Sequence, residues 1–193
     1  MSPWKAAQVG DHFDQIDTPA LILDLDAFER NIKTLQAATS AKGIRLRPHA
    51  KSHKCPEIAK RQIKAGAIGI CCQKVSEAAV FVEAGIEDIF VTNEVVGEKK
   101  VSHVFDLAKR ARIGVLVDHE DQVATFIKAS SERQRKIDIY IEVDVGMGRC
   151  GVTSIEQVAK LAHQIDQAPY LNLMGLQCYH GSCLLYTSDA ADD

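Results

Sequence analysis

The chain has 193 residues, of which 46% are hydrophobic and 25% are charged, with a formal net charge of −3. This length and composition suit one soluble domain, and the small net charge gives no basic surface for nucleic acid or an acidic membrane. No apolar run approaches the roughly 20 residues that a membrane-spanning helix needs. The first 14 residues lack the apolar core of a secretory signal, so a cytoplasmic location is expected.

Cysteines are spread along the whole chain, at positions 55, 71, 72, 150, 178 and 183. Several of them fall inside apolar runs that are typical of strands, which favours buried, reduced thiols over a disulfide framework. Cys71 and Cys72 are adjacent, so in a strand they point to opposite faces. They are therefore not expected to bind one metal ion together.

The chain before residue 44 predicts one strand, Thr18–Asp26, followed by one helix, Ala27–Ala41. Residues 1–43 are expected to form an N-terminal segment that leads into the main domain. This strand and helix could belong to the barrel described next or to a companion domain.

From residue 44 to 182, short apolar or β-branched runs alternate with stretches of helical periodicity. The predicted strands are Ile44–Pro48, Ala67–Cys72, Asp88–Thr92, Arg112–Asp118, Ile137–Asp144 and Leu171–Tyr179. The predicted helices cover about 54–65, 75–84, 98–110, 119–130 and 155–167. Repeated β-α units indicate a parallel sheet that is either doubly wound or closed as a barrel.

The alternation of side chains within the strands favours the barrel. In 137–144 one face is wholly β-branched, while the other carries Asp138, Tyr140, Glu142 and Asp144. Central strands of a doubly wound sheet are usually apolar on both faces, whereas a barrel strand can line an active-site mouth with its polar face. We therefore predict an α/β fold, an incomplete TIM-type (β/α)8 barrel with about six of its eight strands in residues 44–182.

The last residues, 183–193, do not continue the pattern of strands and helices. They resemble the translation of a sequencing adapter, and a natural acidic tail is the alternative. Because the tail begins where the barrel is unfinished, a non-native origin is favoured and these residues are left out of the functional argument.

The densest group of reactive side chains is Arg47-Pro-His-Ala-Lys-Ser-His-Lys54, at the carboxyl end of the first predicted strand. Barrel enzymes place catalytic groups at this end. Period-two geometry puts Arg47, His49 and Lys51 on one face, toward the barrel mouth, and leaves Lys54 as the weaker candidate. Nearby cations, Arg47, His49 and His53, could favour a neutral, nucleophilic Lys51. A solvated basic loop is the alternative.

Polar residues also follow the other predicted strands. They are Gln73, Thr92-Asn93, Asp118-His119, the loop Asp144-Val-Gly-Met-Gly-Arg-Cys-Gly151, and Gln177-Cys-Tyr-His-Gly181. Asp118-His119 is interpreted as a helix N-cap rather than a catalytic pair. No dinucleotide-binding, P-loop, zinc-protease or CxxC motif is present.

Four motifs together carry a resemblance to a known family. They are Asp17-Thr-Pro-Ala-Leu-Ile-Leu-Asp24, Arg47-Pro-His-Ala-Lys-Ser-His-Lys54, Asp144-Val-Gly-Met-Gly-Arg-Cys-Gly-Val152 and Gly175-Leu-Gln-Cys-Tyr-His-Gly-Ser182. In order and spacing they resemble the D-threonine aldolase and D-serine dehydratase group of fold-type III, alanine-racemase-like enzymes, which use pyridoxal 5′-phosphate (PLP). The resemblance covers roughly residues 14–182.

The resemblance implies a set of site residues. Lys51 would bond covalently to PLP, and Lys51 and His180 would be the catalytic residues, His180 on the substrate side. His49, Gln73, Arg149 and Tyr179 would contact the cofactor together with Lys51. No metal ligand is expected in this chain, because the strands that hold the PLP phosphate and a C-terminal domain with a divalent-metal site should follow residue 182.

The activity that the resemblance implies is retro-aldol cleavage of a D-3-hydroxy amino acid to glycine and an aldehyde. D-serine dehydratase, which eliminates the hydroxyl group to give pyruvate and ammonia, is the alternative. A non-catalytic PLP-binding barrel is the second alternative. The full-length parent is expected to be a homodimer with a small-molecule D-amino acid substrate, and the truncated chain by itself is expected to be inactive.

Overall fold

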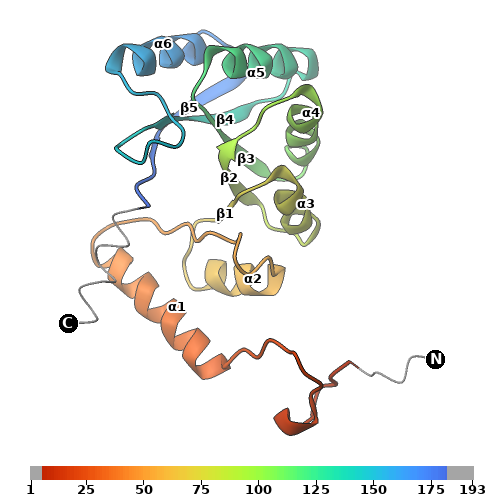
Figure 1. Ribbon diagram of the computed structural model, residues 1–193. Helices are drawn as coiled ribbons and strands as arrows, with labels where there is room; N and C mark the ends of the chain where they lie inside the picture. The colour runs from red at the N-terminus through yellow and green to blue at the C-terminus, as the bar shows by residue number, and fades with distance from the viewer. Residues whose placement is uncertain (1–5, 182–193) are drawn as a thin grey trace.

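The computed structural model describes residues 6–181, which form one parallel sheet with helices between its strands. The elements are η1 (Phe13–Gln15), α1 (Leu25–Ser40), α2 (Pro56–Lys64), β1 (Ile70–Cys72), α3 (Val75–Glu83), β2 (Asp88–Glu94), α4 (Glu98–Leu107), β3 (Arg112–Val117), α5 (Glu120–Arg133), β4 (Ile137–Val143), α6 (Ile155–Asp166) and β5 (Leu171–Cys178). The strands stand in the order β1-β2-β3-β4-β5, all parallel. The predicted partial barrel is therefore confirmed (Figure 1).

The predicted strand count was too high by one, because the first expected strand is not a regular strand. Its segment still runs beside β1, where the amide of Cys71 donates to the carbonyl of Pro48 over 2.7 Å and the amide of Ala50 donates to the carbonyl of Cys71 over 2.8 Å. The amide of Ile68 also donates to the carbonyl of Leu46 over 3.0 Å, but the described residues form only one isolated parallel bridge here, between His49 and Cys71. Pro48 has no amide hydrogen to donate, which leaves the ladder incomplete.

The strand predicted at Thr18–Asp26 is also wrong. Residues 18–24 are irregular and exposed, and Asp24 ends them by accepting a hydrogen bond from the amide of Ala27 over 2.9 Å, as the N-cap of α1. The apolar run Leu21–Leu23 that suggested a strand therefore has no partner strand among residues 6–181. Residues 1–5 and the expected non-native tail lie outside the described residues.

The two faces of the sheet have different surroundings, as the alternation in residues 137–144 predicted. Ile137, Ile139 and Ile141 are at most 1% exposed and belong to the main core, which lies between the strands and the helices that cover one face (Figure 1). Tyr140 faces the other way, into a small inner cluster with Phe90. Each strand therefore turns an apolar face to the helices and a mixed face to the barrel interior.

The adjacent cysteines divide between these two faces, as expected. Cys71 belongs to the inner cluster and Cys72 to the main core. Burial raises the pKa of Cys71 to about 11 and that of Cys72 to about 12, so both stay protonated at neutral pH. The five cysteines among the described residues are all free thiols.

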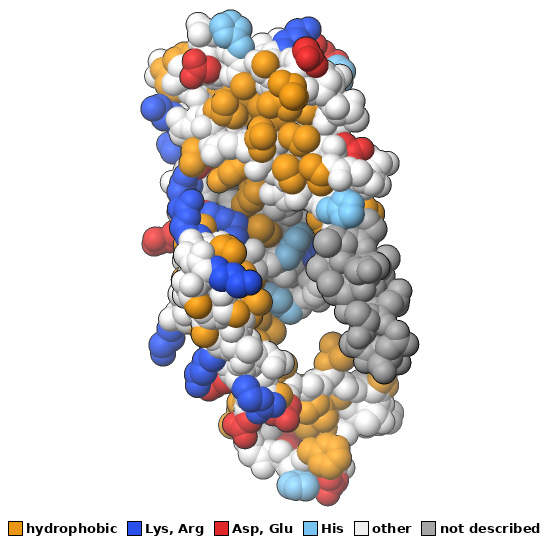
Figure 2. All heavy atoms as spheres, turned by 90° about the vertical axis from the view of Figure 1, so that its left-hand side faces the viewer, with side chains coloured by type: hydrophobic (Ala, Val, Ile, Leu, Met, Phe, Trp, Pro, Cys, Tyr) orange, Lys and Arg blue, Asp and Glu red, His pale blue; other side chains and the backbone are white. Residues whose placement is uncertain are grey.

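The sheet has an open edge at β5, since no other strand among residues 6–181 pairs with its far side. Leu173, Met174 and Leu176 of this edge strand are 39%, 40% and 55% exposed. Figure 2 looks onto the left-hand side of Figure 1 and shows hydrophobic side chains gathered over the upper part of that surface. No helix among residues 6–181 is long and apolar enough to cross a membrane.

A row of charged and polar side chains crosses the sheet near the amino ends of its strands. Arg47 contacts Asp88 at 2.6 Å, and Arg112 contacts Asp88 at 3.6 Å and Asp138 at 2.6 Å. Asn172 of β5 donates to the other oxygen of Asp138 over 2.9 Å. Each charge on this row has an oppositely charged partner within 4 Å, which makes its partial burial tolerable.

Asp138→Ala should therefore destabilise the sheet. Asp138 is 7% exposed and joins β3 to β5 through Arg112 and Asn172. Because half of Arg112 is in solvent, we expect a loss of about 2 kcal/mol in the free energy of unfolding, measured by urea denaturation. Asp106→Ala, which removes an exposed ion pair with Lys109, is the matched control and should change nothing measurable. Equal effects of the two substitutions would contradict this role of the row.

Candidate active site

A cavity of about 440 Å³ opens on the inner face of the sheet. It collects five of the six predicted site residues, namely His49, Lys51, Gln73, Arg149 and Tyr179. The rest of its lining is Arg45, Arg47, Ile68, Cys71, Phe90, Thr92, Tyr140, Glu142 and Gln177. Residues as far apart in sequence as Arg45 and Tyr179 meet here because parallel strands bring their carboxyl ends to one edge.

The two candidate lysines are placed differently. Lys51 lines the cavity, directly after the segment that is bridged to β1. Lys54 has a φ of 49° and its Nζ lies 3.5 Å from Oε1 of Glu77. Helix α2 begins only at Pro56, so Lys54 precedes the helix rather than standing in its first turn. The cavity lining thus contains Lys51 and not Lys54.

His49 is hydrogen-bonded on both ring nitrogens. Its Nδ1 accepts from the amide of Lys51 over 3.2 Å, so in the neutral ring Nε2 carries the proton and donates to Oγ1 of Thr92 over 3.1 Å. Thr92 in turn donates to the carbonyl of Cys72 over 3.3 Å. Burial and the charge of Lys51 both lower the pKa of His49, which keeps the ring neutral at pH 7.

The cations expected around Lys51 are consequently fewer than the sequence suggested. Burial also lowers the pKa of His53, whose Nδ1 accepts from the amide of Cys55 and whose ring packs edge-on against Phe81. Arg47 is charged but paired with Asp88. The idea that three cations act on Lys51 is therefore wrong, because two of them are neutral rings.

The loop that carries Arg149 is held by carboxylates on two strand ends. Asp144 accepts from the amides of Gly146 at 2.9 Å and Gly148 at 3.0 Å, and these bonds lower its pKa. Asp118, at the end of β3, accepts from the amide of Gly151 at 3.0 Å. Gly151 has a φ of 106°, and a Cβ there would stand 2.5 Å from the amide nitrogen of Asp144. Glycine is thus required where the loop turns back.

Arg149 and Tyr179 contact each other directly in the lining of the cavity. The guanidinium carbon of Arg149 lies 4.3 Å from the centre of the Tyr179 ring, within the range of a cation–π contact. The loop after β4 and the end of β5 are thereby joined at one wall of the cavity.

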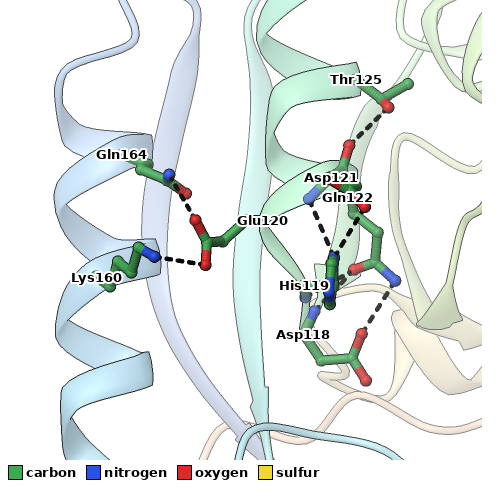
Figure 3. A network of polar contacts seen from close by, with 8 residues as sticks. All are labelled: Asp118, His119, Glu120, Asp121, Gln122, Thr125, Lys160 and Gln164. Atoms are coloured by element: carbon green, nitrogen blue, oxygen red, sulfur yellow. Dashed lines mark hydrogen bonds and ion pairs between the residues drawn. The ribbon is translucent and has the colours of Figure 1, made fainter.

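The pair Asp118-His119 begins α5, as predicted. His119 is the N-cap and its Nδ1 accepts from the amide of Asp121 over 3.2 Å, while Asp118 accepts from Nε2 of Gln122 over 3.0 Å (Figure 3). The neighbouring Glu120 reaches across to Lys160 of α6 at 2.7 Å (Figure 3). His119 therefore caps α5 at the end of the strand-to-helix turn, and it is not among the residues that line the cavity.

His180 is the one predicted site residue outside the cavity lining. Its Nε2 stands 3.5 Å from the position that a Cβ on Gly146 would take, and its charge acts on Asp144. It therefore lies beside the Arg149 loop, and its catalytic role stays a prediction.

Glu142 is a cavity residue that the sequence analysis passed over. It is 3% exposed, and its Oε2 has no hydrogen-bond partner within residues 6–181. Burial raises its pKa to about 7, and the charges of Glu94 and Asp118 add to the shift, while Arg149 opposes it. Its place on the polar face of strand 137–144 was the signal, but nothing in the sequence showed how deeply that face is covered.

Glu142 predicts a pH dependence of stability. Its pKa rises from 4.5 to about 7 on folding, so the folded protein holds a proton that the unfolded chain has released. That contribution is complete below pH 4.5 and is lost as the pH rises through 7. Glu142→Gln should weaken this decline, as measured by urea denaturation at a series of pH values from 5 to 8. The same slope in both proteins would show that Glu142 is not the group responsible.

Comparison with known proteins assigns the chain to a family. The family model for the alanine racemase N-terminal domain matches residues 23–192. The D-threonine aldolase of Arthrobacter sp. is 50% identical over 180 residues, which are 93% of this chain and 48% of that protein. The D-threo-3-hydroxyaspartate dehydratase of Delftia sp. (strain HT23) is 33% identical over 88% of this chain and 42% of its own length.

A solved structure agrees with this assignment. The D-threonine aldolase of Filomicrobium marinum superposes with a TM-score of 0.86 at 49% identity, covering 88% of this chain and 46% of that one. The chain spans about half the length of the curated relatives it matches. Its sequence and its fold thus lead to the same conclusion, that this chain belongs to the alanine racemase N-terminal domain family.

Proposed function

We propose that the protein containing this chain is a PLP-dependent D-threonine aldolase, which cleaves D-3-hydroxy amino acids to glycine and an aldehyde. The observation that carries the proposal is the 50% identity to such an enzyme over 93% of the chain. The dehydratase relative is more distant, at 33%. The cavity supports the same class of chemistry, since a lysine, a neutral histidine, an amide and an arginine line it together.

The cavity suits PLP in size and in its donors. Its volume of about 440 Å³ falls within the range of small-molecule sites. Lys51 offers a primary amine, Arg149 and Gln73 offer hydrogen-bond donors for anionic oxygens, and Tyr179 offers a flat ring surface. The groups that hold the phosphate are expected in the part of the protein that follows residue 182.

Each of the predicted site residues has its own role in this proposal. Lys51 holds the cofactor through its amine, and His49 fixes the backbone of Lys51 through its Nδ1. Arg149 and Gln73 would donate hydrogen bonds to an anionic oxygen of the cofactor, and Tyr179 would offer it a flat surface. PLP, once bound, supplies the electron sink for cleavage of the substrate. His180 accepts the proton of the substrate hydroxyl group.

The proposed roles of the two lysines can be separated by absorbance. Lys51→Ala should abolish the visible absorbance of lysine-bound PLP, because it removes the amine in the cavity. Lys54→Ala is the matched control and should retain it, since Lys54 instead pairs with Glu77. The reverse result would assign the cofactor to Lys54. Both variants should keep the far-ultraviolet circular dichroism of the parent protein.

Dehydration is the second candidate reaction, because a dehydratase shares the fold and 33% of the aligned residues. In that reaction the α-proton and the hydroxyl group leave, and a D-serine substrate gives pyruvate and ammonia. A non-catalytic PLP-binding barrel is the third possibility and would release no product.

Product analysis of the full-length protein decides between these functions. We expect glycine and acetaldehyde from D-threonine, with little pyruvate from D-serine. Pyruvate from D-serine without glycine from D-threonine would establish the dehydratase instead. PLP absorbance with neither product would point to the non-catalytic barrel. L-threonine is the control substrate and should remain uncleaved.

Three further features complete the proposal for the full-length protein. It requires a divalent cation that is held by its C-terminal part, it acts as a homodimer, and it works in the cytoplasm on a small D-amino acid. The open edge at β5 supports a barrel that is completed by later strands.

A further inference from the structure

Three potential metal ligands gather beside Arg149. They are Glu94 at the end of β2, Asp118 just after β3, and Cys150 in the loop after β4. One ligand atom from each lies within 4.8 Å of the other two, and all three residues are partly buried. Two strand ends and the loop after a third strand therefore bring two carboxylates and a thiol together.

A fourth acid adds negative charge at the same place. Glu142 is 3% exposed, and its Oε2 has no partner within the described part of the chain. Its Cγ is 3.1 Å from the position of a Cβ on Gly151, the residue whose amide binds Asp118. Glu94 is the charge that acts on it most strongly, and Asp118 acts on it too. The unpartnered oxygen therefore belongs to the surroundings of this cluster.

The positive charge nearby does not neutralise the cluster. Arg149 acts on both Glu142 and Cys150, yet its guanidinium group lies over the ring of Tyr179. No ion pair within 4.0 Å links an arginine or lysine to Glu94, Asp118 or Glu142 among residues 6–181. Like charges held together in a sheltered place are costly unless protons or a cation compensate them.

We propose that Glu94, Asp118 and Cys150 form a binding site for a divalent cation of the zinc class. Two carboxylate oxygens and a thiolate suit a borderline ion, whereas magnesium and calcium prefer oxygen ligands alone. A water molecule completes the coordination and donates a hydrogen bond to Oε2 of Glu142. On binding, the Cys150 S–H bond breaks, the sulfur coordinates the cation, and one proton passes to solvent.

The site would have a structural consequence for the cavity. Cys150 directly follows Arg149, and the hydrogen bond from Gly151 to Asp118 already ties the loop to β3. A cation at this point would fasten the ends of β2 and β3 to the loop. The inference does not depend on the proposed aldolase activity.

The test uses Co²⁺, whose bond to a thiolate gives a charge-transfer absorbance in the near ultraviolet. The full-length PLP-loaded protein, freed of metal, is titrated with Co²⁺, and difference spectra are taken against Cys150→Ser. We expect this absorbance and one equivalent more of bound Co²⁺ in the parent than in the variant. Cys178→Ser is the matched control, since Cys178 is an exposed thiol at the end of β5, and it should behave as the parent does.

A second variant, Glu94→Gln, tests the proposal even if Cys150→Ser fails to fold. Glu94→Gln keeps the shape of the side chain but removes its charge, and it should weaken Co²⁺ binding at this site at least tenfold. Zn²⁺ should raise the melting temperature of the parent more than that of either variant. Equal Co²⁺ stoichiometry and spectra in the parent and Cys150→Ser would overturn the proposal. In that case Cys150 would keep its proton and donate it in a hydrogen bond to Glu94.

Discussion

Every strand of this sheet must satisfy two environments at once, and the rest of the structure depends on that constraint. The outward side chains pack under the helices, so the outer face is apolar and almost fully buried in β1 to β4 and only partly covered in β5. The inward side chains face a barrel interior that is only partly apolar. Two residues apart on one strand, Asp138 and Tyr140 therefore serve as a charge partner and an aromatic wall.

The charged and apolar side chains of the barrel interior are separated along the direction of the strands. Near the amino ends of the strands, arginines and aspartates alternate from strand to strand and compensate one another. Phe90 and Tyr140, with ring centres 4.3 Å apart, form an apolar layer above that row. Toward the carboxyl ends the compensation stops, and Lys51, Arg149 and Glu142 line an open cavity. Uncompensated groups thus collect at the end of the barrel where a ligand can provide their partners.

Several residues near the cavity serve the backbone. Asp144 binds two loop amides, Asp118 binds a third, and His49 accepts from the amide of Lys51. These bonds orient Arg149 and Lys51, which are the groups that can reach a ligand. Burial is the main cause of the raised pKa of Glu142, and the charges of Glu94, Asp118 and Asp144 add to it. Glu94 and Asp118 also belong to the inferred cation site.

Features of the fold that depend on local sequence patterns could be predicted from the sequence alone. The spacing of apolar side chains within a strand or helix is a local property, so the order of elements from α2 onward, the partial barrel and the place of Lys51 in the cavity lining could all be predicted. Position after a strand gave a wider set of polar residues at one edge of the sheet, and the family resemblance selected His49, Gln73, Arg149 and Tyr179, which line the cavity. The His119 cap of α5 was equally local.

Tertiary structure decided what depends on neighbours that are distant in sequence. The segment before β1 failed to become a strand because Pro48 cannot complete its ladder, and Leu21–Leu23 has no partner strand in the described chain. Protonation was decided in the same way: burial makes His49 neutral and raises the pKa of Glu142, and burial cannot be read from a local pattern. The meeting of Glu94, Asp118 and Cys150 required three strand ends to be aligned in space.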